Sequence, residues 1–487
     1  MMKTKIGFAG FLVVLLFTVI IISGLKHHIS CIRFSYPIDY REGVVQYWVN
    51  SFVNKQPLYP EIQQFPPYVH NPYTPLYIVL TGFLDRLIPE HLVFLAGRLI
   101  SFLCLILSCF LIFLIARRYG SSIAGFFAAG MFFCNPVAIN YGSIETVDMM
   151  ALCLGLSGIY LAIRKKDSPG TLSGILCAAA ILTKPVFVLP AISIFISMLY
   201  NKTVRKSYFI MSFIGCLLLS FLILFLRNKS MFNHLVVLNM LPLSVIHFFT
   251  LFSVVASKHV ILFVLLFVFV FTYKDKKNPF YWYCVLSPIA IVFSAKIGAE
   301  ANYFLEIIAL SSIATGILLT TIDTSLKHIA LPVCIVQLFL FLPFKPAPVF
   351  TKTYGQEIPA SLSTEPDKIL KEAGDLITGE ILSCSDPILS EDIGWLVLCQ
   401  RNVYIEPYQF SQLAKHRRWD ETFILDMIKE KQFNLIVMNA GSFEQDCVAF
   451  TKNMLKAIKE HYTIKRVIGN FYVHEPVFWR DNAQTGN

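Results

Sequence analysis

The segment IGFAGFLVVLLFTVIIISGL (residues 6–25) is an uninterrupted apolar run, and SYPIDYREGVVQYW (residues 35–48) follows it closely. About 20 apolar residues are enough for a helix to cross the hydrocarbon core of a bilayer. Asp39 therefore lies in the first loop outside the membrane. We expect this acid to have a function, because an aromatic and proline-rich stretch, QPLYPEIQQFPPYVHNPYTPLY (residues 56–77), and many further apolar runs follow it.

The whole chain has the composition of a multi-pass membrane protein. Of its 487 residues 56% are hydrophobic and only 15% are charged, and the mean hydropathy is +0.62. A soluble domain is nearer a quarter charged, so a single soluble enzyme is excluded. We attribute the net charge of +10 to cytoplasmic loops rather than to a nucleic-acid partner, because no basic patch with interleaved aromatic residues occurs.

Apolar segments recur as far as Pro343 and predict about eleven transmembrane helices. We expect the first to be retained rather than cleaved as a signal peptide, because it is long for a signal peptide and no small-x-small site follows it. The predicted spans are 6–25, 94–115, 123–140, 148–163, 171–183, 186–200, 207–226, 259–273, 280–296, 304–321 and 329–343.

Basic clusters between alternate spans predict the orientation, because Lys and Arg are enriched in cytoplasmic loops. If all the clusters are on the cytoplasmic side, the loop of Asp39 and the C-terminal region are on the outer side of the membrane. This alternation of loops requires that the apolar stretch 247–258 does not cross the membrane as a separate span, so we expect a helix lying near the outer surface there. The clusters are Lys3/Lys5, Arg117-Arg118, Arg164-Lys165-Lys166, Lys202/Arg205/Lys206, Lys274/Lys276/Lys277 and Lys327.

Residues 26–93 are predicted to form a long first outer loop. Apolar residues recur at helical spacing from Val44 to Val53, which predicts a helix lying in the membrane interface. Packing of this helix against protein is the alternative. A second short helix is expected over 75–87. The polar face of the first helix carries Gln46, Asn50, Asn54 and Lys55.

The chain divides into a transmembrane part, 1–343, and a small extracytoplasmic α/β domain, 344–487. The linker signal PFKPAP (343–348) separates them. Helical patterns are expected over 419–431 and 444–461, and a disulfide between Cys384 and Cys399 is one possibility outside the cytoplasm. The expected strands are EILSCS (380–385), WLVLC (395–399), VYIEP (403–407), FNLIVMN (433–439), TIKRVIG (463–469) and FYVHEP (471–476).

The sequence has no phosphate-loop, dinucleotide, zinc-protease or serine-hydrolase motif. Candidate chemistry therefore lies in polar residues at the outer membrane face, where charged side chains usually face a cavity or a partner. These residues are Asp39, Glu42, His70, Asn71, Tyr73, Arg98, Glu145, Asp148, Lys184, Lys296, Glu300, Asn302, Tyr303 and Glu306.

Such a set suits transfer of a sugar from a polyprenyl phosphate. The lipid tail would lie in the bilayer, and cations would hold the leaving phosphate at the interface. A carboxylate such as Asp39 would take the proton of the acceptor hydroxyl, with Glu42 close by. The phosphate-binding candidates are Arg98, Lys184 and Lys296, and the sugar or acceptor contacts are His70, Asn71, Tyr73, Glu145, Asp148, Asn302, Tyr303 and Glu306.

Structural roles remain open for several of these residues. Asp39 has the residue type of a helix cap, and Glu145 and Asp148 are favourable charges at a helix N-terminus. Arg98 and Lys184 are long enough to reach the membrane interface. For Asn302 and Glu306 the alternative is an interhelical hydrogen bond. For His70, Asn71 and Tyr73 it is a turn at Asn-Pro that needs no further function.

The order of these elements resembles that of the GT-C superfamily of polytopic glycosyltransferases, which includes protein O-mannosyltransferases and the aminoarabinose transferases of lipid A. The resemblance covers nearly the whole chain. The matching phrases are IDYREG (38–43), QPLYP (56–60), PYTPLY (72–77), GRLISF (97–102), ARRYG (116–120), SIETVDMMAL (143–152), AAAILTKPVFVLP (178–190), ANYFLEIIAL (301–310) and the tail over 388–439.

The resemblance implies a GT-C-like fold, a polyprenyl-phosphate-sugar donor, inversion at the anomeric carbon and an outer-face site with Asp39 as base. A tail without β-trefoil repeats implies a bacterial-type member in the inner membrane. The acceptor is left open between lipid, protein and polysaccharide, with membrane lipids as further partners. Many relatives have two adjacent acids in the first loop, whereas this chain has Asp39-Tyr40-Arg41-Glu42. A divalent cation is left open as cofactor, because no ligand set stands out.

Two other functions fit a polytopic chain with charges near the membrane. One is a transporter or lipid flippase of the cell envelope, and the other is a non-catalytic assembly factor. Transporters often have inverted repeats with helices broken at matched positions, and this sequence has no such repeat.

Overall fold

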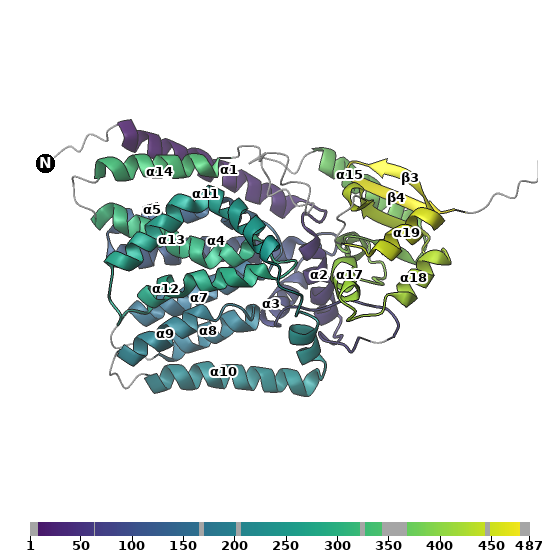
Figure 1. Ribbon diagram of the computed structural model, residues 1–487, viewed down its shortest axis with the longest axis horizontal. Coiled ribbons are helices and arrows are strands. Elements are labelled where there is room, and N and C mark those ends of the chain that lie inside the picture. Colours follow the sequence, from purple (N-terminus) through teal and green to yellow (C-terminus); the bar gives the residue numbers. More distant parts are fainter. Residues whose placement is uncertain are drawn as a thin grey trace, which may run out of the picture.

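The computed structural model describes residues 8–62, 64–164, 170–200, 206–321, 327–342, 368–443 and 449–477. Long helices run alongside one another through the larger part of the molecule, and a small α/β unit lies at one end of them (Figure 1). This arrangement confirms the predicted fold class, a polytopic helical protein with a small C-terminal α/β domain. The expected linker PFKPAP lies outside the described residues.

Each predicted span falls on helical structure. Among the described helices α1, α4, α10, α11 and α13 contain stretches long and apolar enough to cross a membrane alone, and the other apolar helices are shorter. The bounds are α1 (Phe8–Arg33), α4 (Leu95–Tyr119), α5 (Ser122–Phe133), α6 (Pro136–Tyr141), α7 (Asp148–Arg164), α8 (Thr171–Thr183), α9 (Leu189–Tyr200), α10 (Lys206–Arg227), α11 (Val245–Thr272), α12 (Pro279–Val292), α13 (Leu305–Thr321) and α14 (Lys327–Phe341).

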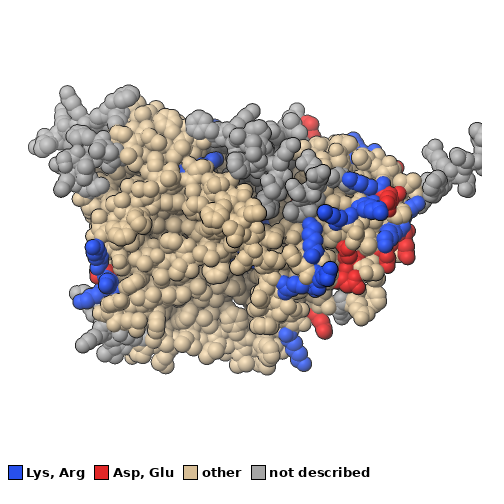
Figure 2. Space-filling view, in the orientation of Figure 1, with Lys and Arg blue, Asp and Glu red and all other residues tan. Residues whose placement is uncertain are grey.

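The surface of this bundle confirms an integral membrane protein. Charged side chains gather on the C-terminal unit and at the opposite end, and the face between them shows few (Figure 2). Large apolar side chains are exposed along the bundle, for example Phe110, Leu218 and Phe267 at 55%, 66% and 64%. Leaving so much apolar surface in water costs free energy, whereas lipid covers it without that cost.

The prediction of a separate surface helix over 247–258 is wrong. Those residues belong to α11, one continuous helix of 28 residues. The Ser244 hydroxyl caps its first turn, and no proline or glycine interrupts it. The polar residue His259 is accommodated inside it by bonds to Val255 O at 2.7 Å and to the Asn135 side chain at 2.7 Å. By length and composition α11 is sufficient for one membrane span.

The first loop contains α2 (Tyr40–Val53) and α3 (Leu76–Asp85). The second of these confirms the helix expected over 75–87. The expectation that α2 lies in the membrane interface is wrong, because both of its faces are buried and Gln46, on the expected polar face, is 1% exposed. The helix packs instead against α3 and α16 (Gly394–Leu398) of the C-terminal unit. Packing on protein, the alternative, is what the structure has.

The C-terminal unit is a four-stranded sheet of order β1-β2-β4-β3 with helices around it. β1 and β2 pair in parallel, and the other pairs are antiparallel. The bounds are α15 (Lys368–Ser383), β1 (Ile388–Ser390), α17 (Pro407–Lys415), α18 (Thr422–Lys429), β2 (Leu435–Asn439), α19 (Lys452–His461), β3 (Tyr462–Ile468) and β4 (Phe471–Pro476).

Three of the six expected strands are confirmed, β2, β3 and β4. EILSCS instead ends α15, where Ile377 and Ile381 are buried four residues apart, the spacing of one helix face. WLVLC lies in α16, and VYIEP makes only an isolated bridge, from Ile405 to Tyr68. The thiols of Cys384 and Cys399 are free, so the possible disulfide between them does not form.

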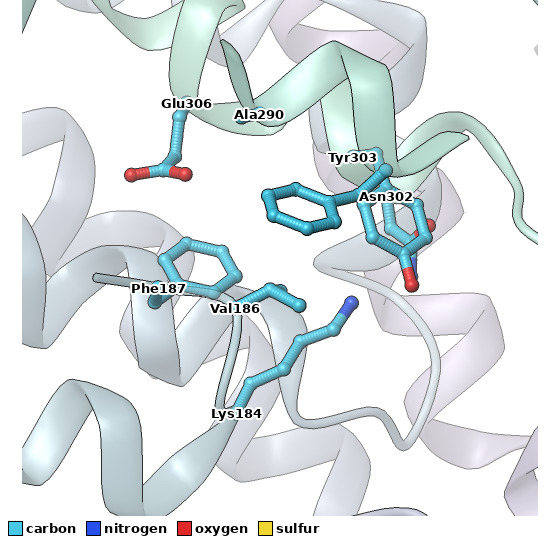
Figure 3. A pocket seen from close by; sticks show the side chains of 8 residues that line it. Lys184, Val186, Phe187, Ala290, Asn302, Tyr303 and Glu306 are labelled. Carbon is cyan, nitrogen blue, oxygen red and sulfur yellow. The ribbon is translucent and has the colours of Figure 1, made fainter. Parts of the chain in front are cut away.

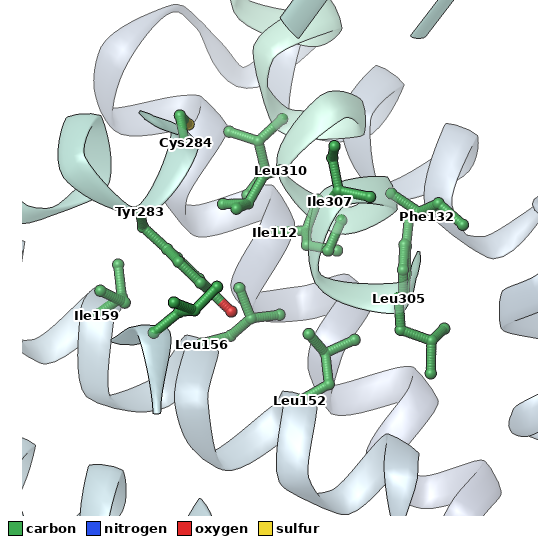
Figure 4. Close-up of a cluster of buried hydrophobic side chains, with 14 of the residues drawn as sticks. Ile112, Phe132, Leu152, Leu156, Ile159, Tyr283, Cys284, Leu305, Ile307 and Leu310 are labelled. Atoms are coloured by element: carbon green, nitrogen blue, oxygen red, sulfur yellow. The ribbon is translucent and has the colours of Figure 1, made fainter. Parts of the chain in front are cut away.

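The largest hydrophobic core lies in the middle of the helix bundle, around α13 (Figure 4). Leu152, Leu156 and Ile159 of α7 face Leu310 of α13 there, and Tyr283 of α12 lies beside them. A second core joins α2 and α3 to the C-terminal unit. The two units are therefore held together by apolar packing across the first loop, which positions the polar residues between them.

We expect Gly43→Ala to loosen this junction, because a Cβ at Gly43 would overlap the backbone N and Cα of Gly394. Overpacking of this kind costs roughly 1–3 kcal/mol. Thermal unfolding in detergent should show a lower melting temperature, with faster proteolysis of the C-terminal unit. The control is Gly379→Ala on the exposed face of α15, where a Cβ meets nothing within 4 Å. Equal effects of the two substitutions would contradict this account of the junction.

Candidate active site

A cavity of about 230 Å³ lies where the membrane helices meet the C-terminal unit. Its walls come from the start of α2, the loop before α3, the connection between α8 and α9, the segment 296–303 and the start of α17. Apolar and aromatic residues make much of the lining. The charged residues that line it are Arg41, Lys184, Lys296, Glu300 and Glu406.

Arg41 lies between two carboxylates at the cavity wall. Its Nε and Nη2 donate to Asp39 Oδ1 and Oδ2 at 2.6 and 2.5 Å, and its Nη1 lies 2.5 Å from Glu300 Oε2. The Tyr141 hydroxyl accepts from Arg41 at 2.8 Å and donates to Glu300 at 3.1 Å. Because a guanidinium keeps its charge in proteins, Arg41 holds both carboxylates in place.

Asp39 is the N-cap of α2 and accepts from the backbone N of Arg41 at 2.9 Å. The structural alternative considered for this residue is therefore present. A carboxylate has about four acceptor positions, so a cap does not exclude a second role. The next residues along the chain, Tyr40 and Arg41, form the cavity wall.

Glu300 is a second carboxylate at this place, directly before η3 (Ala301–Phe304). Burial raises the pKa of Glu300 to about 7, although the Arg41 charge opposes the shift. A carboxyl group with a pKa near neutrality can both take up and release a proton at physiological pH, which is typical of general bases.

Four of the residues expected at the site meet at the end of α8. Lys184 Nζ lies 2.6 Å from Asp148 Oδ1, and Asn302 Nδ2 donates to the same oxygen at 3.0 Å. The Lys184 ammonium is 4.7 Å from the centre of the Tyr303 ring, and the close-up shows it directed toward Tyr303 and Asn302 (Figure 3). Lys184, Asn302 and Tyr303 all line the cavity.

Lys296 supplies a second ammonium to the cavity. Its Nζ donates to Asn239 Oδ1 at 2.7 Å and to Asn239 O at 3.3 Å, which are both uncharged atoms. Burial, with a smaller contribution from the Lys184 charge, lowers the pKa of Lys296 to about 8. Burial therefore destabilises the charged ammonium form of Lys296, and an anion in the cavity would stabilise it.

Glu42 and Arg98 lie together and away from the cavity. Arg98 Nε and Nη2 donate to the two Glu42 oxygens at 2.8 Å each, and both side chains are fully buried. Arg98 also donates to the backbone oxygens of Cys31, Phe34 and Tyr36. This geometry corrects the expectation that Arg98 binds a phosphate and that Glu42 acts as a base, because each already holds the other.

Glu145 is also fully buried and lies behind this pair. Its backbone N donates to Glu42 Oε1 at 2.9 Å, and the end of the Gln46 side-chain amide lies 3.0 and 3.1 Å from its two carboxylate oxygens. Burial, with the nearby Glu42 charge, raises the pKa of Glu145 well above its ordinary value. Glu145 is thus placed in the packing between α2 and α4, and not at the cavity as expected.

The three residues expected from the HNPY phrase divide into two groups. His70 and Tyr73 line the cavity, whereas Asn71 is fully buried beside it. Asn71 N donates to His234 Nδ1 at 3.0 Å, and its Nδ2 donates to Leu58 O at 3.1 Å. These bonds show that Asn71 holds the structure of the loop. Burial lowers the pKa of His70 to about 3, so its ring is neutral.

Sequence reasoning left two charged cavity residues, Arg41 and Glu406, out of the expected site. Arg41 lies in the phrase IDYREG, and Glu300 was among the polar residues expected at the outer face, but nothing in a sequence shows that these two form a pair. Glu406 comes from the C-terminal unit, where it accepts from His70 N at 3.2 Å, and burial raises its pKa to about 8. Only the docking of that unit reveals its place.

The described residues contain no group of three or more His, Cys, Asp or Glu side chains arranged to hold a metal ion. The carboxylates of the cavity are engaged instead by Arg41 and Lys184. We therefore derive no step through a metal.

Known proteins share parts of this sequence and its fold. Residues 74–226 match the family model described as dolichyl-phosphate-mannose-protein mannosyltransferase. This stretch runs from the loop before α3 to the end of α10. A search of curated protein sequences gave no match.

Solved structures share the fold over nearly the whole chain. ArnT from Cupriavidus metallidurans in the apo state has a TM-score of 0.62 at 13% identity, covering 95% of this chain and 98% of that one. ArnT bound to undecaprenyl phosphate gives 0.60 at 14% identity, with coverages of 97% and 99%. The oligosaccharyltransferase AglB from Archaeoglobus fulgidus, with an inhibitory peptide and a dolichol-phosphate, gives 0.55 at 11%, with coverages of 97% and 75%. These likenesses confirm the expected GT-C fold.

We expect Arg98→Leu to be strongly destabilising, because it leaves the Glu42 carboxylate buried without its cation. Removal of one member of a buried ion pair costs about 3–5 kcal/mol. The double variant Glu42→Leu/Arg98→Leu should recover part of that loss, as measured by thermal unfolding in detergent. Lys465→Ala is the control, since it breaks an exposed pair with Glu380 and should cost less than about 1 kcal/mol. A small effect of Arg98→Leu would contradict the structural role.

Proposed function

We propose that this protein is an integral-membrane inverting glycosyltransferase that moves a sugar from a polyprenyl phosphate to an acceptor hydroxyl. The observation that carries the proposal is the cavity at the ends of the membrane helices, which two ammonium groups line. A guanidinium and one of these ammonium groups are paired with carboxylates there. The mannosyltransferase family match and the fold shared with a protein that binds undecaprenyl phosphate support the same class.

The proposed orientation follows from the charges of the loops. The active-site cavity and the C-terminal domain, 344–487, would be on the extracytoplasmic side of a bacterial inner membrane, and the basic clusters on the cytoplasmic side. The lipid tail of the donor would then lie in the outer leaflet beside the cavity. A nucleotide-binding motif is not needed, because the sugar arrives already activated by its phosphate.

Lys296 and Lys184 are the proposed contacts of the donor phosphate. Lys296 has no carboxylate partner among the described residues and donates only to the uncharged oxygens of Asn239, so its charge is not neutralised before a phosphate arrives. Lys184 is held by Asp148, which fixes the position of its ammonium. As the bond from the anomeric carbon to the phosphate oxygen breaks, negative charge grows on that oxygen, and cations fixed beforehand stabilise it.

Asp39 is the proposed general base, with Glu300 as the second carboxylate held by the same Arg41. The acceptor oxygen attacks the anomeric carbon from the side opposite the phosphate, so the configuration inverts. One bond forms between the acceptor oxygen and that carbon, and one breaks between the carbon and the phosphate oxygen. The hydroxyl proton goes to the carboxylate, and polyprenyl phosphate leaves with the bonding electron pair.

The remaining expected residues have proposed places around this reaction. His70 and Tyr73 form the wall near the C-terminal unit and are proposed to contact sugar or acceptor. Asp148, Asn302 and Tyr303 hold or border Lys184. The acceptor is proposed only by its chemistry, as a hydroxyl on a lipid, a protein or a polysaccharide.

We expect Asp39→Asn to lower transfer at least about 10²-fold, the usual contribution of a general base. Asparagine keeps the cap of α2, so the protein should still fold. The measurement is transfer of label from a panel of polyprenyl-phosphate sugars into membrane extract. Asp420→Asn is the matched control, because Asp420 makes the same kind of bond to the backbone N of Thr422 at an exposed site. Full turnover of Asp39→Asn would remove Asp39 from the mechanism and leave Glu300 as the base.

The pH dependence of transfer should be narrow. Glu300 must lose its proton to pair fully with Arg41, so kcat/KM should rise as the pH passes about 7. Lys296 must keep its proton to attract the phosphate, so kcat/KM should fall as the pH passes about 8. Lys296→Arg should remove the alkaline fall, because arginine stays charged. An unchanged alkaline limb in this variant would exclude Lys296 as its source.

A further inference from the structure

A small recess adjoins the cavity and ends at a buried acid. Its volume is about 10 Å³, which is close to the space that one water-sized group needs. The recess and the cavity have Lys184, Val186, Asn302 and Tyr303 in common, so the two spaces are neighbours. The rest of the lining consists of Phe187, Ala290, Phe293 and Glu306 (Figure 3).

Glu306 is held in place at one end of the recess. It lies in the first turn of α13 and is 3% exposed. The hydroxyl of the fully buried Tyr283 donates to its Oε1 at 2.7 Å. This single bond orients the carboxylate and leaves further acceptor positions of the carboxylate available, since each oxygen has two lone pairs.

Asn302 contributes a second acceptor. Its Nδ2 is used in the bond to Asp148, which fixes the amide so that Oδ1 is the remaining polar atom. Oδ1 is buried and has no hydrogen-bond partner among the described residues. A buried acceptor without a partner costs about 1–3 kcal/mol, so a structure that keeps one calls for an explanation.

The recess therefore suits a substituent that donates a hydrogen bond. Lys184 and the Tyr303 hydroxyl lie in the wall that the recess shares with the cavity, and Lys184 is bound to Asp148 there. The acceptor positions left open in the recess are those of the Glu306 carboxylate and Asn302 Oδ1. The rest of the wall is aromatic or aliphatic. A group that enters must be small and must bring its own N–H or O–H.

We infer that the recess binds one hydroxyl or ammonium substituent of the sugar carried by the donor. Glu306 is the residue that accepts a hydrogen bond from this substituent and so determines specificity for it. This inference rests on the proposed function. The sugar is the part of the substrate that reaches the recess, because it is joined directly to the phosphate and Lys184 lies in the wall common to both spaces. A site built to bond an O–H or N–H rejects an analogue that lacks it, because its own polar groups stay unsatisfied.

The experiment compares donors that differ at one position of the sugar, with hydroxyl, hydrogen or amino there. The wild type should use one hydroxyl or amino donor at least about 10²-fold better in kcat/KM than the matching deoxy donor. The double variant Tyr283→Phe/Glu306→Leu removes the acid without leaving a tyrosine hydroxyl unpaired. Because Asn302 Oδ1 remains, it should lower this ratio at least about tenfold rather than abolish it, mainly through a fall in kcat/KM for the preferred hydroxyl or amino donor.

The control variant is Ser312→Ala on the same helix, where the hydroxyl bonds only to the backbone oxygen of Ile308 at 2.8 Å. Its discrimination ratio should equal that of the wild type. If the double variant keeps the wild-type ratio, or loses all donors equally, the recess does not read the sugar. The amino and hydroxyl arms identify which of the two groups enters.

Failure of the proposed function gives a different result. In that case the wild type transfers no sugar from any donor and does not bind bare polyprenyl phosphate in a direct binding assay. Binding of bare polyprenyl phosphate that is equal in wild type and double variant, together with a lowered ratio, supports the inference. If the protein binds polyprenyl phosphate and transfers sugar but the ratio is unchanged in the double variant, the role of the recess is refuted and the proposed function is not.

Discussion

The buried ion pair between Arg98 and Glu42 holds the first loop in place, because each of these fully buried charges is the partner of the other. Arg98 belongs to α4, and it gathers the carbonyl oxygens of Cys31, Phe34 and Tyr36 as well as the Glu42 carboxylate. Glu42 accepts in turn from the backbone N of Ile38 and of Glu145. One cation and one anion thereby tie the end of α1, the first loop, α2, α4 and the segment before α7 together.

The position of Asp39, the proposed base, follows from this network. Asp39 comes one residue after Ile38 and three before Glu42, so bonds on both sides of it are fixed by the buried pair. An uncompensated charge in such a place costs several kcal/mol, and the loop cannot shift without breaking several bonds. Arg41 then reaches from the same turn to Glu300, which joins the first loop to the segment before α13. The cavity is thus walled by residues far apart in the chain.

Part of the candidate site was predictable because it depends only on which end of a helix a residue occupies. Lys184, Asp148, Asn302 and Tyr303 lie at ends that loop parity places on one side, and the structure brings all four together. Arg98 and Glu42 obey the same parity but lie deeper and pair with each other. Parity gives the side of the membrane and carries no information on depth or partner, so these two were assigned to the wrong role.

Sequence alone determined the membrane class, the helix positions and the presence of a C-terminal α/β unit, because hydrophobic length and spacing are local properties of the chain. It also led to Lys184, Lys296 and Glu300 among the charged residues that line the cavity, but not to Arg41 or Glu406. Tertiary structure alone decided that α2 is buried, that WLVLC is helical, that Glu406 reaches the cavity and that Arg41 pairs with Glu300. Each of these depends on contacts between segments distant in the sequence, and the free energy of such contacts cannot be read from either segment by itself.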